Sequence, residues 1–380
     1  MKTRAAFIVL VAAATLATVA RSGHEQPVYP SYYPHEIEIS VTEPERAAVL
    51  LATGKLHAFI GQPPNFAGSP PNSVRAVESL GSFLVIRANP ARENEESACA
   101  AVRAFAADLG GRAGEFVFHP YPVTPMHGDY LHHVDLAEAA KARLLAAKAD
   151  PAPRELKVRA SGAIARNLVR PAALVQGAEW DLEIVQLSAA ELAISATLAI
   201  NGWLGPPWLK EGWFHALLLL DETSGASAAR ERAEAAARRL QAHDFRDLAE
   251  RINLERELVA TLARNCRALV VGYTMKREYF SAEFSAGIEN IAFDSITGMN
   301  SAIFLRTVKL KDFPWNGELA LAFATPPVSA WNPVAGFTDP FGRLLWSAVG
   351  DPALLSSPYG AEWMFNRVSD VESVPARKAE

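Results

Sequence analysis

The chain has 380 residues, half of them hydrophobic, and a formal net charge of −5. This hydrophobic content suffices for a substantial core, so the composition excludes a disordered protein, and the length predicts two domains or one large domain. Acidic and basic residues are interspersed and leave no broad basic field, which excludes a nucleic-acid backbone as the main partner.

The first twenty residues have the layout of a secretion signal. Lys2 and Arg4 precede an uninterrupted run of apolar and small residues that starts at Ala5, and a cleavage point follows Ala20. The run is short and rich in alanine, which favours a cleaved signal at 1–20 over the alternative of an uncleaved membrane anchor. We therefore expect an exported protein that is periplasmic or secreted.

Strand and helix signals alternate in residues 21–150, which we expect to form a first α/β lobe. Polar and apolar residues alternate over 36–41 and predict a strand. A helix is predicted to begin near Pro44 and to end at Gly54, and a short strand follows at 56–60.

Further along this lobe, "LGSFLVIRANP" predicts an apolar strand. The run that starts at Asn94 has acidic residues at its beginning and a double glycine at its end, which indicates a helix, and "EFVFHPYPV" then indicates another strand. The histidine-rich stretch "VFHPYPVTPMHGDYLHHVD" therefore follows the carboxyl end of a strand. In open α/β sheets, ligands bind at that position.

Residues 151–265 are expected to form a helix-rich second region. "RELKVRASGAIARNLVR" predicts a strand and a short helix, and "WDLEIVQLSAAELAISATLAI" predicts a strand and an apolar helix in which Glu191 argues against a membrane span. "LKEGWFHALLLLDE" continues the apolar helical character. Ala, Arg and Glu dominate 224–264, which predicts an inserted helical hairpin broken near His243.

Residues 266–380 change to a strand-like character. The segments "RALVVGYTMKREYF", "SAIFLRTVKLKDFPW", "ELALAFATPP" and "GRLLWSAVGD" are each predicted as strands separated by turn residues. We expect this strand-rich C-terminal region to pack on the lobes. The fold class predicted from the whole chain is α/β, with a mixed sheet and a two-lobed body.

Cys99 and Cys266 are the two cysteines of the chain. In an oxidising compartment they allow a single bridge between distant segments. The alternative is that both are small buried hydrophobes, because each lies at the margin of a packed element. The sequence leaves both interpretations open. No C-x-x-C-H occurs, which excludes covalently attached haem.

Four of the nine histidines lie between residues 117 and 135, together with aspartates and prolines. Imidazoles and carboxylates are ligands for zinc, copper, iron or nickel. The candidate metal ligands are His119, His127, Asp129, His132 and His133. The spacing argues against a metal, because no H-E-x-x-H is present and adjacent histidines point in different directions on a regular element. The alternatives are a pocket for a non-metal ligand and a proline-stiffened loop whose histidines bond backbone groups.

Large aromatic side chains with a polar group suit the wall of a site for an organic ligand or sugar, and the alternative is that they anchor the core. The candidate ligand-binding residues are Tyr32, Tyr33, His119, Tyr121, His127, Tyr130, Trp203 and Trp208. His215, near Lys210 and Glu211, is either an acid/base group or a satisfied core residue.

The chain has no G-x-S-x-G elbow, no Walker loop and no G-x-G-x-x-G fingerprint. Acyl hydrolases and nucleotide-dependent enzymes therefore lose their simplest support, and neither haem nor a nucleotide is expected as a cofactor. A transition metal stays open as the cofactor, and the sequence does not decide whether the protein is an enzyme.

Residues 36–135 resemble the first lobe of periplasmic solute-binding proteins. The resemblance rests on a strand, a helix ending in "LLATGKLHAFIG", the strand in "SLGSFLVIRANP" and the helix of Cys99 that leads to another strand. In that family, this unit builds a lobe that closes on a small ligand. No family motif carries a binding residue onto this chain.

The resemblance implies an exported ligand-binding or transport-accessory protein. Its ligand would be a small molecule or ion, and its partner a membrane permease or an envelope complex. One alternative is a metal-dependent periplasmic enzyme that uses residues 119–135. Another is an envelope assembly or interaction factor that grips a partner with the hairpin at 224–264.

Overall fold

The structure is a computed structural model. It describes residues 34, 36–91, 95–112, 114, 116–146, 156–195, 207–220, 228–264, 266–312, 317–328, 337, 339–350 and 353–370. The predicted secretion signal at 1–20 and three of the candidate ligand-binding residues, Tyr32, Tyr33 and Trp203, lie outside the described residues.

One mixed sheet of eight strands organises the described residues. In order across the sheet, its strands are β1 (Glu36–Val41), β10 (Glu318–Phe323), β2 (Ala58–Ile60), β7 (Ala268–Ser281), β3 (Val74–Ala88), β6 (Leu182–Ser188) and β5 (Val158–Ser161), and β4 (Val117–Phe118) also pairs with β7. The β1–β10, β10–β2 and β5–β6 pairs are parallel and the other pairs of this sheet are antiparallel. The predicted α/β class with a mixed sheet is confirmed.

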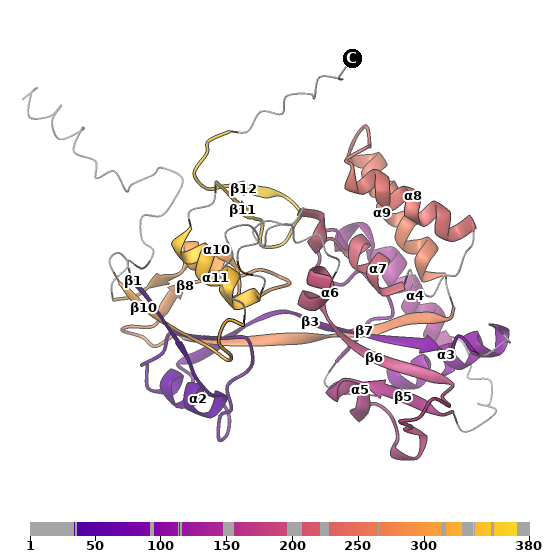
Figure 1. Cartoon of the computed structure of the whole chain (residues 1–380), viewed down its shortest axis with the longest axis horizontal. Coiled ribbons are helices and arrows are strands. Elements are labelled where there is room, and N and C mark those ends of the chain that lie inside the picture. Colours follow the sequence, from indigo (N-terminus) through magenta and orange to yellow (C-terminus); the bar gives the residue numbers. More distant parts are fainter. Residues whose placement is uncertain are drawn as a thin grey trace, which may run out of the picture.

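The two longest strands, β3 and β7, join two lobes of the molecule (Figure 1). They pair with each other from Val74 opposite Ser281 to Arg87 opposite Ala268, with a register shift between Leu80 and Ser82. Strands β1, β10 and β2 lie at one end of this pair, and β4, β5 and β6 lie at the other.

We call residues 34–80 and 275–370 the terminal half and residues 82–274 the inserted half. The inserted half is one continuous segment that begins within β3 and ends within β7. Residues 21–150, expected as a first lobe, contribute strands to both halves. Gly81 lies at the crossing, where a Cβ atom would be 2.8 Å from Thr274 Oγ1.

Helices cover both faces of the sheet in the terminal half. Helix α2 (Pro44–Ala52) buries Ala47 and Leu51 against Phe59, while α10 (Ala302–Thr307) and α11 (Pro340–Val349) pack with Ile60 on the other face. Successive side chains of a strand point to opposite faces, so the three buried residues of β2 pack into two separate hydrophobic cores, one on each face of the sheet.

The inserted half follows the same rule along β3. Phe83 belongs to the core formed with α7 (Gly212–Leu220), α8 (Ala228–Gln241) and α9 (Leu248–Ala263). Leu84 belongs to the core on the opposite face, formed with α3 (Glu95–Gly110) and α5 (Ala163–Asn167). The predicted helical hairpin is present as α8 and α9, and His243, in the turn between them, has a φ of 53°.

The remaining elements are short apart from α4. They are α4 (Val134–Ala146), α6 (Ala189–Ser195), β8 (Ile288–Asn290), β9 (Lys309–Leu310), β11 (Leu354–Ser356) and β12 (Trp363–Phe365), with single 3-10 turns at Tyr130–His132, Pro171–Ala173 and Pro207–Lys210. No helix among the described residues combines the length and the apolar character needed to cross a membrane.

A disulfide bond joins Cys99 in α3 to Cys266 just before β7. Of the two interpretations that the sequence left open, the bridged one is therefore correct. Cys99 is also one of the buried residues of α3.

Two segments predicted as strands in the C-terminal region are helices. Residues 302–307 form α10, in which the consecutive side chains of Ile303, Phe304 and Leu305 are buried, and residues 340–349 form α11. The start of α11 is fixed by Asp339, whose carboxylate accepts the backbone N–H of Gly342 at 2.9 Å, and by Pro340 in the first turn. Short apolar runs do not by themselves distinguish a strand from a buried helix, and here the capping residues decide.

The strand predicted in "EFVFHPYPV" is reduced to the two residues of β4. Pro120 and Pro122 follow at once and have no N–H to donate to a neighbouring strand. The chain leaves the sheet there and enters the histidine-rich loop.

Candidate functional site

The histidine-rich loop, residues 119–133, is held in place by its own ring nitrogens. His119 leaves the sheet with its backbone N–H bonded to the Val271 carbonyl at 3.0 Å, and its Nε2 lies 2.8 Å from the Val123 carbonyl. His127 Nδ1 accepts the backbone N–H of Thr124 at 2.9 Å. These contacts match the predicted alternative in which the loop histidines bond backbone groups.

His127 also meets His215 in the core of the inserted half. His127 Nε2 and His215 Nδ1 are 2.9 Å apart, and both residues are buried. Burial lowers the pKa of His215 to about 4 and, together with the neighbouring His215 ring, holds the pKa of His127 well below its usual value. Both rings are therefore neutral near pH 7, and one donates a hydrogen bond to the other.

Asp129 fixes the loop to the start of α7. Its carboxylate accepts the backbone N–H groups of Gly212 at 2.9 Å and Trp213 at 3.2 Å, which belong to the unpaired first turn of that helix. A Cβ atom at Gly212 would lie 2.4 Å from Val123 Cγ1, so glycine is needed for this close approach. Burial is the main influence on the Asp129 carboxyl and raises its pKa to about 7.

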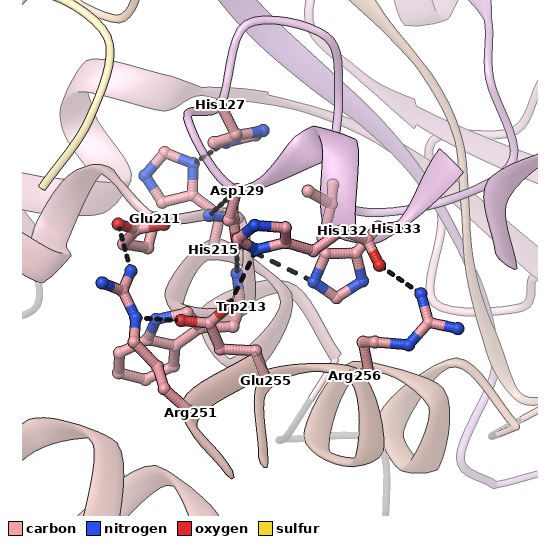
Figure 2. A network of polar contacts seen from close by, with 12 residues as sticks. His127, Asp129, His132, His133, Glu211, Trp213, His215, Arg251, Glu255 and Arg256 are labelled. Carbon is pink, nitrogen blue, oxygen red and sulfur yellow. Dashed lines mark hydrogen bonds and ion pairs between the residues drawn. The ribbon is translucent and has the colours of Figure 1, made fainter. Parts of the chain in front are cut away.

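His132 and His133 follow Asp129 and both lie beside carboxylates (Figure 2). His133 Nε2 is 3.9 Å from Asp129 Oδ2, and its Nδ1 is 3.0 Å from the Tyr121 hydroxyl. His132 Nδ1 is 3.6 Å from Oε2 of Glu255, which comes from α9. Burial, aided by the charge of Arg256, lowers the pKa of His133 to about 4, so this ring is neutral near pH 7.

Two arginines of α9 complete this region. Arg251 bonds Glu255 at 2.6 Å and Glu211 at 3.0 Å, and Arg256 binds the Asp135 carboxylate through two hydrogen bonds of 2.7 Å. Burial and the charge of Asp129 raise the pKa of Glu211 to about 8. We call Asp129, His132, His133, Glu211, Arg251 and Glu255 the buried cluster.

Of the five candidate metal ligands, the structure brings Asp129, His132 and His133 together, while His119 and His127 bond other groups. The adjacent histidines were expected to point apart. Both reach the buried cluster because His132 ends a 3-10 turn and His133 precedes α4, so neither lies within a regular element.

Glu211 and Glu255 were not predicted as site residues. A signal for Glu255 exists in "NLERELVATL", where this carboxylate shares the buried face of α9 with Leu254, Leu258 and Val259. A buried charged side chain needs an oppositely charged or hydrogen-bonding partner. A glutamate on the apolar face of a predicted helix can therefore be recognised in the sequence as a candidate site residue.

A pocket of about 210 Å³ lies where the two halves meet. Lys210 lines it from the inserted half, and Asp294, Ser301 and Trp346 are among the residues that line it from the terminal half. Lys210 Nζ is 2.5 Å from Asp294 Oδ2, and both side chains are largely buried.

The segment 353–370 of the terminal half includes β11 and β12 (Figure 1). It lines the pocket through Leu354, Leu355 and Ser356, and it also contacts the inserted half. Lys210 donates a hydrogen bond to the Ser357 carbonyl, and the backbone N–H of Ser295 donates to the Pro358 carbonyl at 2.8 Å. The histidine-rich loop also reaches this segment, because a Cβ atom at Gly128 would lie 2.6 Å from the Tyr359 carbonyl oxygen.

None of the described candidate ligand-binding residues lines this pocket. His119, Tyr121, His127 and Trp208 are buried in the inserted half, and Tyr130 is half-buried there. Their role in ligand binding stays a prediction. The polar residues that line the pocket lie in loops, helices and the short strand β11, and they share no sequence motif.

No protein-family model matches the chain, and no curated protein sequence matches it. Solved structures of oligopeptide-binding and other substrate-binding proteins are similar to it. One is the oligopeptide-binding protein AppA from Bacillus subtilis in complex with a nonapeptide, with 10% identity and a TM-score of 0.37, over 70% of this chain and 58% of that one.

Two further similar structures are NikA from Staphylococcus aureus and DppA from Helicobacter pylori. NikA, in complex with Ni(L-His)2, has 11% identity and a TM-score of 0.38, over 70% of this chain and 60% of that one. DppA, in complex with the peptide STSA, has 13% identity and a TM-score of 0.39, over 71% of this chain and 55% of that one. The chain thus spans under two thirds of these proteins, and similarity at this level assigns neither a ligand nor a site residue.

Proposed function

We propose that the protein is an exported ligand-binding protein or transport accessory that holds a small polar solute in the pocket between its two halves. The observation that carries this proposal is the lining of the pocket, which combines Lys210 of the inserted half with Asp294 and Ser301 of the terminal half. Binding sites occur preferentially at the interfaces between such units.

The lining indicates the chemistry of the solute. Lys210 and Asp294 supply a paired ammonium and carboxylate, and Ser301 and neighbouring hydroxyl groups supply hydrogen-bond donors and acceptors. Leu355 and Trp346 add an apolar wall. A solute with both hydrogen-bonding groups and a short apolar part satisfies this lining, and the small volume favours a molecule smaller than a peptide.

The connection between the halves favours closure around the solute. In the part of the chain that the structure describes, the main sheet continues from one half to the other only through β3 and β7. One of the two shifts in the pairing of these strands lies at Gly81, between the two lobes. A shift in register at a crossing of this kind lets a few backbone angles absorb a rotation of one half against the other.

The disulfide between Cys99 and Cys266 supports export, because such bonds persist in oxidising compartments. The predicted secretion signal agrees with the same location. We further propose a membrane permease as the partner that would receive the solute.

A thermal-shift screen of amino acids, sugars, polyols and small organic acids, followed by calorimetry of each positive compound, tests the proposal. We expect at least one compound to raise the melting temperature, and we expect Ala302→Leu, which places three more carbons in the pocket lining, to weaken its binding at least tenfold. Ala235→Leu adds the same atoms to the exposed surface of α8 and serves as the matched control.

The outcome that contradicts the proposal is a screen without any positive compound at saturating concentrations. A compound whose affinity is the same in wild type, Ala302→Leu and Lys210→Gln would also contradict it, because binding would then lie elsewhere.

A further inference from the structure

Unpaired polar atoms gather in the buried cluster. Among the described residues, Oε2 of Glu255, Oε2 of Glu211, Nε2 of His133 and Nδ1 of His132 are buried atoms without a hydrogen-bond partner. His133 and Glu255 are themselves fully buried. A buried polar atom without a partner costs on the order of 1–3 kcal/mol, so four at one place call for a bound group that the protein atoms alone do not provide.

The positions of these atoms suit an ion better than direct hydrogen bonds. One ligand atom each from Asp129, His133 and Glu255 lie within 4.8 Å of one another. His133 Nε2 is 3.9 Å from Asp129 Oδ2, beyond hydrogen-bond distance. Two ligands bound at about 2.0–2.2 Å to one tetrahedral ion are separated by about 3.4 Å, so a small rotation of each side chain closes the set.

The charge of the cluster points to a cation. When all three are ionised, Asp129, Glu211 and Glu255 carry three negative charges. Among the described residues, Arg251 is the cationic side chain that bonds to Glu211 and Glu255, so the ionised cluster has two negative charges in excess (3 − 1). Arg256, the other arginine facing this region, is held by Asp135 on the exposed side. One divalent cation balances the excess.

We propose that Asp129, His133 and Glu255 bind one divalent first-row transition-metal ion, and that His132, whose Nδ1 lies 3.6 Å from Glu255 Oε2, orients that carboxylate. A mixture of imidazole and carboxylate ligands is typical of zinc, manganese, iron and nickel and unlike the all-oxygen sites of calcium and magnesium. Asp129, His133 and Glu255 are themselves buried, so the role of the ion is to tie the histidine-rich loop to α9 rather than to act on a substrate.

This site does not depend on the proposed function, because its three ligands come from the histidine-rich loop and α9 and none of them lines the pocket between the halves. The metal-free alternative is a cluster in which bound protons neutralise the surplus carboxylates. The two alternatives differ in what is retained after purification and in how variants respond to added metal.

Protein stripped with EDTA is incubated separately with zinc, manganese and nickel chloride, passed over a desalting column, and measured by elemental analysis and thermal denaturation. We expect about one ion per chain for at least one of the three metals. At a free concentration far above the Kd, we expect that metal to raise the melting temperature by at least about 5 °C.

Glu255→Gln preserves shape and removes the ligand charge, and His133→Gln removes the imidazole. We expect both variants to retain at least tenfold less metal and to lose the metal-dependent rise in melting temperature. Glu257→Gln on the exposed face of the same helix and His243→Asn in the exposed turn are the matched controls, and both should behave as wild type.

The proposal is overturned if, after stripping, incubation with metal and desalting, the wild-type protein retains no more metal than Glu255→Gln does. It is equally overturned if the rise in melting temperature is the same in wild type and in Glu255→Gln, because the metal would then bind elsewhere. If His133→Gln does not fold, Glu255→Gln alone decides, since a neutral amide in an overcharged cluster is not expected to prevent folding.

Discussion

Reducing the disulfide between Cys99 and Cys266 should destabilise the protein by an amount that the length of the closed loop sets. The cysteines are 167 residues apart, and nearly the whole inserted half lies between them. For a loop of this length, the loss of chain entropy in the unfolded state corresponds to about 5 kcal/mol at 25 °C. Measured values for single disulfides are commonly about 2–4 kcal/mol, so we expect a loss between about 2 and 5 kcal/mol.

The assay is urea unfolding of the oxidised and the reduced protein, followed by circular dichroism. We expect the midpoint to fall by on the order of 1 M on reduction, and the dependence on urea to steepen because the reduced unfolded chain is more expanded. The double variant Cys99→Ala/Cys266→Ala is the control, since its midpoint should not respond to reductant.

Two results would refute this reasoning. One is an equal midpoint and slope for the oxidised and reduced wild-type protein. The other is free reaction of both cysteines with iodoacetamide, without prior reduction, in protein purified from an oxidising compartment.

Three smaller perturbations test other parts of the structure. Gly81→Val should lower stability by about 1–3 kcal/mol in urea unfolding, because its Cβ would lie 2.8 Å from Thr274 Oγ1, whereas Gly68→Ala, with open space around its Cβ, should not. Gly212→Ala should be destabilising, and Val123→Ala in the same chain should restore part of the loss, because the clashing Val123 methyl groups are then absent. Hydrogen bonds from two arginines hold the pKa of the Glu250 carboxyl at about 2, so its stabilising contribution is full above the ordinary pKa of about 4.3 and is lost as the pH falls through 2. Glu250→Gln should therefore lower the urea midpoint near pH 7, and this effect should shrink as the pH is lowered toward 2 and disappear below it.

Local signals in the sequence located most of the helices. Pro44 and Gly54 bracket α2, and the break near His243 separates α8 from α9, because proline, glycine and a residue with positive φ act on the backbone directly. The two halves could not be predicted in the same way. They depend on the pairing of β3 with β7 across the whole inserted half, and no local pattern encodes a pairing of that separation.

The residues of the candidate site also fall into those that local sequence signals indicate and those that only the tertiary structure brings in. The density of histidines drew attention to His132, His133 and Asp129, which lie within five residues of one another. Their partners Glu211 and Glu255 come from elements far along the chain and have no spacing motif. What could be recognised in advance was a charged residue on the apolar face of α9, whereas its partner required the tertiary structure.

The position at which the chain crosses between the halves has a consequence for how the molecule can be divided. Leu80 faces Met275 and Ser82 faces Thr274 in the antiparallel pair, so the inserted half departs and returns at neighbouring points of two hydrogen-bonded strands. Excising residues 82–274 and joining the strands by a short turn would convert β3 and β7 into an ordinary β-hairpin with β1, β2 and β10 intact beside it. The terminal half is in this sense a complete sheet that accommodates a second body in place of a hairpin loop.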